Sequence, residues 1–277
     1  RGYLLLLRTV GRYNKMSRVE VIPVSIAKDI KISKGYDLAS LILYSIKANG
    51  LELMDKDVVV VTQKVVSKAE GRVVDLADVT PSDDAVKIAK EQEKDPRVVE
   101  LMLRDAKRIV AMQNGVIITE TRHGFVCANS AIDGSNVEDN CVTLLPIDPD
   151  ASARRIRDGL MKATGKRVAV IISDTFGRPF REGQVNVAVG IAGMKPIIDY
   201  RGLRDMYGKE LRVTSIAVAD EVASAAELVM GKSRGIPVAI VRGLEYEDVE
   251  DASINELIRE ESRDIFLKLA ASKGSVI

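Results

Sequence analysis

Two aspartates stand beside apolar runs typical of buried strands, where carboxylates are candidates for metal-assisted chemistry. Asp133 lies in the segment NSAIDGSNVED, in which Asn136 and Glu138 offer further oxygen donors. Asp174 directly follows the apolar run VAVII and is followed by Thr175. Such oxygen donors are the ligands that Mg²⁺, Mn²⁺ and Ca²⁺ prefer. The alternatives are an Asx-turn loop with solvated carboxylates for the first segment and an ordinary surface loop with salt bridges for the second.

Basic side chains follow similar runs and could hold an anion. Arg178 and Arg181 in DTFGRPFREG could clamp a phosphate or a carboxylate. Lys64 and Lys68 follow the run VVVV, although a lone lysine there is usually solvated. The segment MGKSRGIP at 230–237 combines cations with glycines that let backbone amides approach an anion, and a helix cap with a turn is the alternative. Together these segments predict a hard-metal, polyanion site built from several strand ends.

The composition excludes several other kinds of chemistry. The 277 residues include 41 Lys and Arg, 40 Asp and Glu, one His and two Cys. This balance provides no basic field for general nucleic-acid binding, and a zinc site of nitrogen and sulfur ligands is nearly impossible. His123 is expected in a hairpin turn, and Cys127 and Cys141 could form at most one bridge. The segment GLMKATGK at 159–166 fails the spacing of a phosphate-binding loop.

The elements that must position these residues mix strands and helices without a strict alternation. Strands are predicted around Val19 to Val24 and at 57–61, 108–113, 116–120, 125–128, 167–173, 185–191, 214–219 and 237–241. Helices are predicted after the caps Asp37, Ser82, Asp95, Asp150, Asp220 and Ser253. Consecutive strands favour an α+β fold of mixed or antiparallel sheets with flanking helices, and not a doubly wound sheet.

The predicted organisation is an extension at residues 1–15 followed by one domain of two lobes at 16–277. No apolar run reaches the roughly 18 residues that span a bilayer, so a soluble, cytoplasmic protein without a membrane partner is expected.

Several stretches together resemble one known family. They are VEVIPV, TQKVVSKAEGRVV, ANSAIDGSNVED, TGKRVAVIISDTFGRPFREGQVNVAVGIAG, DYRGLRDMYGKEL and ADEVASAAELVMGKSRGIPVAIVRG, in the family's order. The chain is similar over about residues 19–243 to the coenzyme F420-0:γ-glutamyl ligases, in their archaeal single-domain form. A C-terminal redox domain, as in the actinobacterial counterparts, is therefore not expected.

This resemblance implies a GTP-dependent ligase of coenzyme F420 biosynthesis. It would join the carboxylate of F420-0, a deazaflavin with a phospholactate side chain, to the amine of L-glutamate, and then add a γ-linked glutamate. The most plausible activated species is an acyl phosphate made with GTP, with release of GDP and phosphate. The resemblance also implies two divalent ions per site, Mg²⁺ or Mn²⁺, together with potassium, and an intertwined homodimer.

Residue by residue, the resemblance assigns roles to the segments above. The implied metal ligands are Asp133, Asp174 and Thr175. The implied GTP-contacting residues are Pro23, Val24, Ser25, Ile26, Gln63, Lys64, Lys68, Asn136, Met230, Gly231, Lys232, Ser233, Arg234, Gly235 and Ile236. Lys68, Arg178 and Arg181 would supply catalytic positive charge.

The chain departs from the family pattern at two places. Some members have an acidic residue where Lys232 stands and one residue more in that loop, so a metal ligand from the loop is not expected here. Residues 1–15 have no counterpart, and similarity after Gly243 is loose. Two other functions remain open. One is a metal-dependent phosphohydrolase that uses the same aspartates to activate water, and the other is a nucleotide-binding dimer module without chemistry.

Overall fold

The computed structural model describes residues 18–272. The strands are β1 (Glu20–Val24), β2 (Val58–Thr62), β3 (Val73–Asp75), β4 (Ala106–Gln113), β5 (Val116–Thr121), β6 (Val126–Ala128), β7 (Cys141–Thr143), β8 (Ala169–Gly177), β9 (Gln184–Ala192), β10 (Ile198–Asp199), β11 (Ser215–Ile216) and β12 (Val238–Arg242). The α-helices are α2 (Leu38–Ala48), α3 (Gln63–Ala69), α4 (Asp83–Gln92), α5 (Pro96–Asp105), α6 (Pro149–Thr164), α7 (Val218–Met230) and α8 (Ile265–Ser272). The predicted extension at 1–15 lies outside the described residues.

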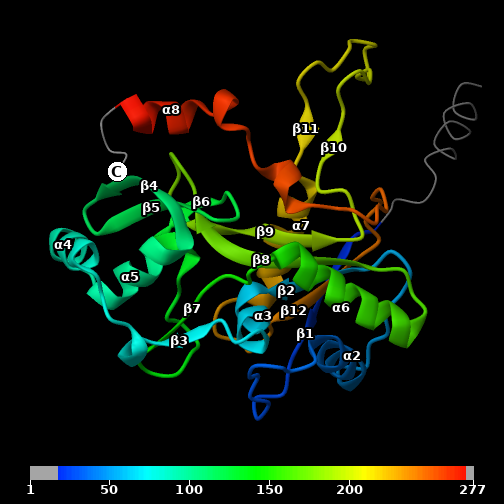
Figure 1. Cartoon of the computed structure of the whole chain (residues 1–277). Helices are drawn as coiled ribbons and strands as arrows, with labels where there is room; N and C mark the ends of the chain where they lie inside the picture. Colours follow the sequence, from blue (N-terminus) through cyan, green and yellow to red (C-terminus); the bar gives the residue numbers. More distant parts are fainter. Residues whose placement is uncertain (1–17, 273–277) are drawn as a thin grey trace, which may run out of the picture.

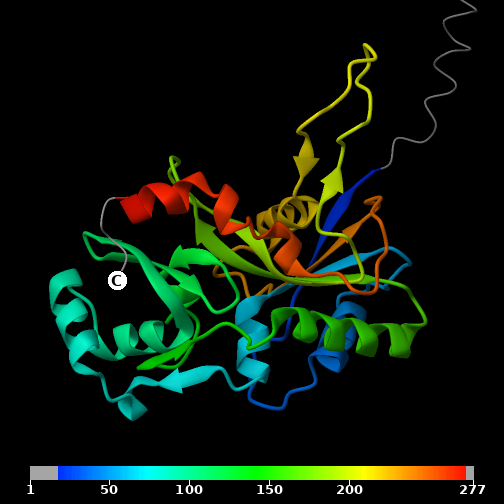
Figure 2. The same ribbon diagram turned by 45° about the horizontal axis from the view of Figure 1, so that its top comes forward.

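A five-stranded mixed sheet in the order β1-β12-β2-β8-β9 forms the centre of the molecule (Figure 1). β2 and β8 are parallel, and the other neighbouring pairs are antiparallel. β2 and the first part of β8 are uninterrupted buried aliphatic runs, as expected for strands covered on both faces. Helices α2 and α6 lie on one face and α7 on the other, which is clearest in Figure 2.

The remaining sheets are smaller and antiparallel. β4, β5 and β6 form a three-stranded sheet next to α4 and α5, and a second cluster of buried apolar side chains lies there, separate from the cluster around the main sheet. β3 pairs with β7, and β10 pairs with β11 at the base of a long arm, residues 198–216, that extends away from the body (Figure 1). The predicted α+β class with mixed and antiparallel sheets is confirmed, whereas the two lobes and the dimer stay predictions.

Several predicted helix starts are confirmed. The side chains of Asp37, Ser82 and Asp95 each accept a backbone hydrogen bond at the start of α2, α4 and α5. α6 ends at Gly165, which has a left-handed backbone (φ 70°) that glycine adopts without strain.

Two predicted caps were wrong, and each side chain instead joins separate segments. The cap of α6 is Asp148, because Pro149 takes the first helical position and the cap must precede it. Asp150 is buried and accepts from the backbone N of Ile191 and Ile254 at 2.8 and 3.0 Å. Asp220 lies in the first turn of α7 and accepts from Ala188 N at 2.9 Å, which ties the helix to the edge strand β9.

Other differences lie at element boundaries. The predicted strand at 214–219 is only Ser215–Ile216, because α7 already begins at Val218. Ser253 caps a short 3₁₀ turn and not an α-helix. The helix α3 was not predicted: it follows β2 without an intervening loop, and its valines favour a strand. β7, only three residues long, was also missed.

Candidate functional site

Four of the predicted site segments meet at one edge of the main sheet. In the strand register, Val24 pairs with Val238, Val238 with Val61, and Thr62 with Ser173. Four strand ends therefore lie side by side: the ends of β1 and β2, the end of the part of β8 that pairs with β2, and the start of β12. The chain leaving or entering each strand carries one predicted segment: residues 23–26, 63–68, 174–175 and 230–236.

Asp174 lies within β8 and not beyond its end, which corrects the sequence-based placement. β8 continues to Gly177 because it keeps pairing with β9 as a long hairpin. Its parallel neighbour β2 stops at the pair of Thr62 with Ser173, so Asp174 is the first residue past the shared sheet. Asp174 thus lies at the carboxyl edge of the parallel pair β2 and β8, although it was predicted to lie beyond the end of its own strand.

The fifth segment joins this edge through two lysines of α3. Lys64 and Lys68 lie four residues apart, on one face of the helix. Lys64 Nζ donates to Asp133 Oδ2 at 2.5 Å and also to the Ser135 hydroxyl and carbonyl. Lys68 Nζ donates to the carbonyl oxygen of Asn136 at 2.6 Å. The two lysines thus fix the Asp133 loop against the end of β2.

Asp133 is held in its ionised form. The Ser135 amide donates to Asp133 Oδ1 at 2.7 Å, which is the Asx turn that the sequence allowed. Partial burial raises the pKa of this carboxyl, but the hydrogen bonds from Lys64 and Ser135 outweigh burial, and the pKa lies below its ordinary value. Burial and the neighbouring Lys64 lower the pKa of the Lys68 ammonium.

Asp174 is in the opposite situation. Burial, and then the negative charge of Asp133, raise its pKa to about 6 against the lowering effects of the Thr175 amide, Lys232 and Lys64. Its hydrogen bond at 2.8 Å comes from the Thr175 amide, and no salt bridge to it occurs among residues 18–272. The site therefore holds two mutually repelling carboxylates, of which one has no strong counter-ion.

Thr175 belongs to a closed ring of four side chains, the Thr175 ring. Its hydroxyl donates to Asn186 Oδ1 at 2.6 Å, and Asn186 Nδ2 donates to Glu227 Oε2 at 3.0 Å. Lys232 Nζ lies 3.8 Å from Glu227 Oε1 and donates to Thr175 Oγ1, which closes the ring. Asn186 and Glu227 were missed from the sequence. The signal was a single polar residue in each of two apolar runs, VNVAV and AAELVM.

The donor set fits a hard divalent cation. Asp133 and Asp174 offer carboxylate oxygens and Thr175 a hydroxyl, the ligands that Mg²⁺ and Mn²⁺ prefer. A cation between the two carboxylates would offset the burial and the repulsion from Asp133 that together raise the pKa of Asp174. In the described part of the chain, no group of three or more His, Cys, Asp or Glu residues forms a metal site.

The predicted nucleotide segments differ in how their side chains are placed. Gln63 is buried and donates to Leu144 O at 3.1 Å and to Ser67, so its amide faces the interior. The backbone of Ser25 is held by Asn49, the C-terminal cap of α2, whose amide donates to Ser25 O at 3.0 Å. In the segment 230–236, Gly231 and Gly235 have φ values of 60° and 70°, which side chains rarely adopt.

Arg178 and Arg181 lie apart from these contacts, in the hairpin loop between β8 and β9. Arg178 donates to the carbonyl of Glu182 at 3.3 Å, and its Nε is buried without a partner. Arg181 is exposed. Within residues 18–272, neither arginine forms a hydrogen bond or ion pair with another predicted site residue.

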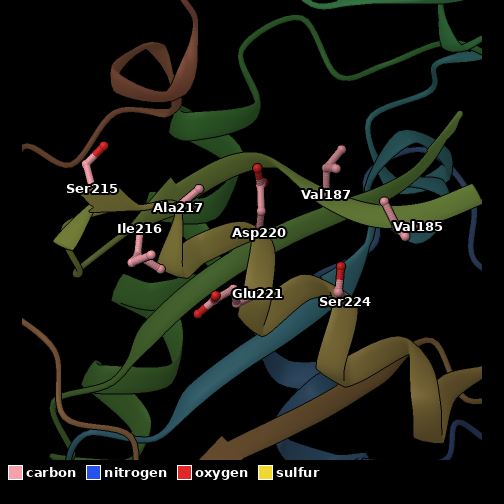
Figure 3. Close-up of a pocket in the computed structure, with 8 residues that line it drawn as sticks. All are labelled: Val185, Val187, Ser215, Ile216, Ala217, Asp220, Glu221 and Ser224. Atoms are coloured by element: carbon pink, nitrogen blue, oxygen red, sulfur yellow. The ribbon is translucent and has the colours of Figure 1, made fainter. Parts of the chain in front are cut away.

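A separate open cavity of about 350 Å³ lies between β9, β11 and the start of α7. Figure 3 shows Asp220, Glu221 and Ser224 of α7 beside Val185 and Val187 of β9. None of the predicted site residues lines it. His123, predicted as a turn residue, lies in the turn between β5 and β6, where its Nε2 is 2.9 Å from the carbonyl oxygen of Pro146.

Comparison with known proteins defines the class of protein to which the chain belongs. The chain is 47% identical over 237 residues to the "Coenzyme F420:L-glutamate ligase" of Methanothermobacter thermautotrophicus, covering 85% of this chain and 94% of the relative. It is 47% identical over 253 residues to the protein of that name from Methanopyrus kandleri, covering 90% and 97%. The Archaeoglobus fulgidus protein of that name is 42% identical over 249 residues, covering 90% and 96%. The chain is thus an amide-forming ligase.

The profile of the family described as F420-0:Gamma-glutamyl ligase matches residues 28–243. The chain belongs to this family. In the described range, no helix has the length and apolar character to cross a bilayer.

Proposed function

We propose that this ligase joins L-glutamate to coenzyme F420-0 at the sheet edge that carries Asp133 and Asp174, with GTP as co-substrate. The family and the names of its relatives support F420-0 and L-glutamate as the substrates. The observation that carries the site is the meeting of Lys64, Asp133 and Asp174 at this edge beside the glycine-containing segment 230–236. Amide formation from a carboxylate requires activation, and phosphoryl transfer from a nucleoside triphosphate supplies it.

The reaction runs in two balanced steps. A carboxylate oxygen of F420-0 attacks the γ-phosphorus of GTP, so an acyl phosphate forms and GDP leaves. The amine of glutamate then attacks the acyl carbon, phosphate leaves with the bonding electron pair, and the amine loses a proton to a base. We further propose that a second round adds a γ-linked glutamate.

The chain's own residues contribute position and charge. Lys64 holds Asp133 in its ionised form, and α3 places Lys68 at the same edge, where its ammonium would contact phosphate oxygens of the bound nucleotide. Ammonium groups there stabilise the charge that develops on the transferred phosphoryl group. Asp133, Asp174 and Thr175 would hold Mg²⁺ or Mn²⁺, which neutralises phosphate charge when bound. Arg178 and Arg181 would add positive charge from the hairpin loop. A potassium ion remains an expectation from the resemblance.

The direct test is mass spectrometry of F420-0 incubated with the protein, GTP, Mn²⁺ and L-glutamate. A mass gain of one glutamyl unit, with GDP formed only when both F420-0 and glutamate are present, supports the ligase. Phosphate release from GTP without glutamate would instead support the phosphohydrolase alternative.

The assignment of Asp133 is tested in the same assay. Asp133→Ala removes the carboxylate that Lys64 holds, and we expect turnover to be lost while the circular dichroism spectrum is retained. If this variant kept its activity, Asp133 would not be part of the site. If it bound GTP as the wild type does and neither protein turned over, the non-catalytic alternative would be favoured.

We also propose a homodimer. The arm at 198–216 projects from the body (Figure 2). It exposes four apolar side chains: Leu203, Met206, Tyr207 and Val213. Met206 and Tyr207 are 98% and 96% exposed, which is unusual for large apolar residues unless they contact a partner. Sedimentation of the variant with Met206→Ser and Tyr207→Ser should give a monomer where the wild type gives a dimer.

A further inference from the structure

Lys232 contacts one of the proposed metal ligands. Its ammonium donates to Thr175 Oγ1, the hydroxyl proposed as a metal ligand next to Asp174. The positive charge of Lys232 also acts on the adjacent Asp174 carboxylate. Lys232 therefore interacts with one proposed ligand directly and with the adjacent one through its charge.

The Thr175 ring holds this ammonium in place. Asn186 is 2% exposed, and its amide has one fixed orientation because Oδ1 accepts from Thr175 and Nδ2 donates to Glu227. Glu227 in turn attracts the ammonium at 3.8 Å. Lys232 is thus not only a solvated surface lysine, although most of its side chain is open to solvent.

The ring also limits what Thr175 can offer to a metal. Its hydroxyl proton points to Asn186, and one of its two lone pairs accepts from Lys232. One lone pair remains. Thr175 can therefore contact a single further cation, and that cation must tolerate an ammonium on the same oxygen.

The charges at this edge are close to balance without any ion. Three ammonium groups, Lys64, Lys68 and Lys232, lie among four carboxylates, Asp133, Asp174, Glu138 and Glu227. Two divalent ions would add four positive charges to this set. One divalent ion next to Asp174, bound together with the phosphates of a nucleotide, leaves the smaller net charge.

We propose that the Lys232 ammonium stands in for the second divalent ion, so that each chain binds one Mg²⁺ or Mn²⁺ with its nucleotide. The inference rests on the proposed metal and nucleotide site and changes its stoichiometry. Sites with two metals hold the ions about 3.5–4 Å apart, where both contact the transferred phosphate. Here a fixed side-chain cation fills one of those two places.

The test is to count bound Mn²⁺ ions by equilibrium dialysis in the presence of a non-hydrolysable GTP analogue. The electron paramagnetic resonance spectrum of the same complex is then recorded. Wild type should bind one Mn²⁺ per chain and give the spectrum of an isolated ion. Lys232→Glu replaces the ammonium by oxygen donors beside Glu227 and Thr175. It should bind two ions, show spin coupling between them, and gain more thermal stability from Mn²⁺ than wild type does. Lys232→Arg keeps the charge and should bind one.

Two outcomes would overturn this inference. One is a spin-coupled pair of Mn²⁺ ions in wild type, a result that does not depend on any variant folding. The other is a folded Lys232→Glu protein that still binds one ion. If wild type bound no Mn²⁺ with the analogue, the proposed metal site itself would fail. Lys162→Met, at an exposed lysine near the end of α6, is the matched control and should behave as wild type.

Discussion

The two ends of the five-stranded sheet each carry a buried aspartate, and the two carboxylates differ in how their charge is paired. At the start of β2, Asp57 is 1% exposed, and Arg242 donates to both of its carboxylate oxygens at 2.8 Å. The Met54 amide donates to the same carboxylate, also at 2.8 Å. At the other end, Asp174 receives one hydrogen bond, and burial raises its pKa to about 6. Asp57 is thus paired with an arginine, whereas Asp174 has no direct ion pair within residues 18–272.

This difference separates a structural charge from a functional one. A buried ion pair with its hydrogen bonds complete stabilises a single arrangement of β2 and β12, and nothing remains for a ligand. A carboxylate held near a second carboxylate costs stability in the isolated protein, and a bound cation recovers it. A buried carboxylate that lacks an ion pair, on an otherwise regular sheet, therefore indicates the functional site better than the residue type alone does.

The largest effect on stability is expected at the compensated end. Asp57→Ala leaves Arg242 without its partner, and breaking such a pair costs about 3–5 kcal/mol of unfolding free energy. Turnover per folded molecule should stay at the wild-type level, because the ion pair lies at the end of the sheet remote from the site. Urea denaturation and active-site titration measure the two quantities separately.

A double variant keeps this prediction testable if Asp57→Ala does not fold. Asp57→Ala combined with Arg242→Met removes both charges and should recover much of the lost stability. A loss of catalysis in the folded double variant would show that the two ends of the sheet are coupled, against the comparison drawn above.

The uncompensated end should respond in the reverse sense. Asp174→Asn is expected to lower the turnover number by about 10²–10³-fold, the range for loss of one preorganised charge-stabilising group. Stability should not fall, because the wild-type carboxylate is already disfavoured in its ionised form. Steady-state kinetics and thermal unfolding at pH 8 test the two halves of the prediction.

Asp158→Asn is the matched control, since Asp158 is exposed on α6. It should change neither quantity. A destabilised Asp174→Asn protein would mean that Asp174 has a structural role after all.

Lys68 should show an intermediate effect with a distinct pH signature. Lys68→Met removes a charged hydrogen-bond donor, equivalent to about 1.5–3 kcal/mol, or roughly tenfold to a hundredfold in turnover. Because burial and Lys64 lower the pKa of Lys68, wild-type turnover should fall on the alkaline side below the ordinary lysine value of 10.5. Lys68→Arg should retain activity to higher pH, and an unchanged alkaline limb would contradict this role.

The sequence predicted the buried strands and the helix starts better than it predicted the arrangement of the site. The apolar runs that became β2, β8 and β12 were found because burial on both faces leaves a clear pattern. The starts of α2, α4 and α5 were found because a capping side chain acts on its own helix. Asp150 and Asp220 were misassigned because their carboxylates bond to distant strands.

The site itself was predicted by residue type but not by arrangement. Nothing local to Thr175 indicates that Asn186 and Glu227, from β9 and α7, would join it in a ring. Such contacts depend on strand register and on the packing of α7 against β9. Gln63 shows the reverse case. It was assigned to the nucleotide site, but its buried amide donates to a backbone carbonyl in the protein interior.

The smallest predicted effect concerns a compensated carboxylate in the second buried cluster. Ser82 donates to Glu100 through its hydroxyl at 2.6 Å and its amide at 2.9 Å, and these bonds, with Arg104, hold the pKa of Glu100 at about 2. A lowered carboxyl pKa gives stability that is complete above the ordinary value of 4.5 and is lost as the pH falls towards 2. Ser82→Ala should cost about 1 kcal/mol at pH 7, as for a helix cap, and should move the acid loss to higher pH. Urea denaturation at pH 7 and pH 3.5 measures both, with the exposed Ser33→Ala as control. An unchanged acid limb would mean that the Ser82 hydroxyl adds nothing to the ionised form of Glu100, which the backbone amide of residue 82 and Arg104 would then hold without it.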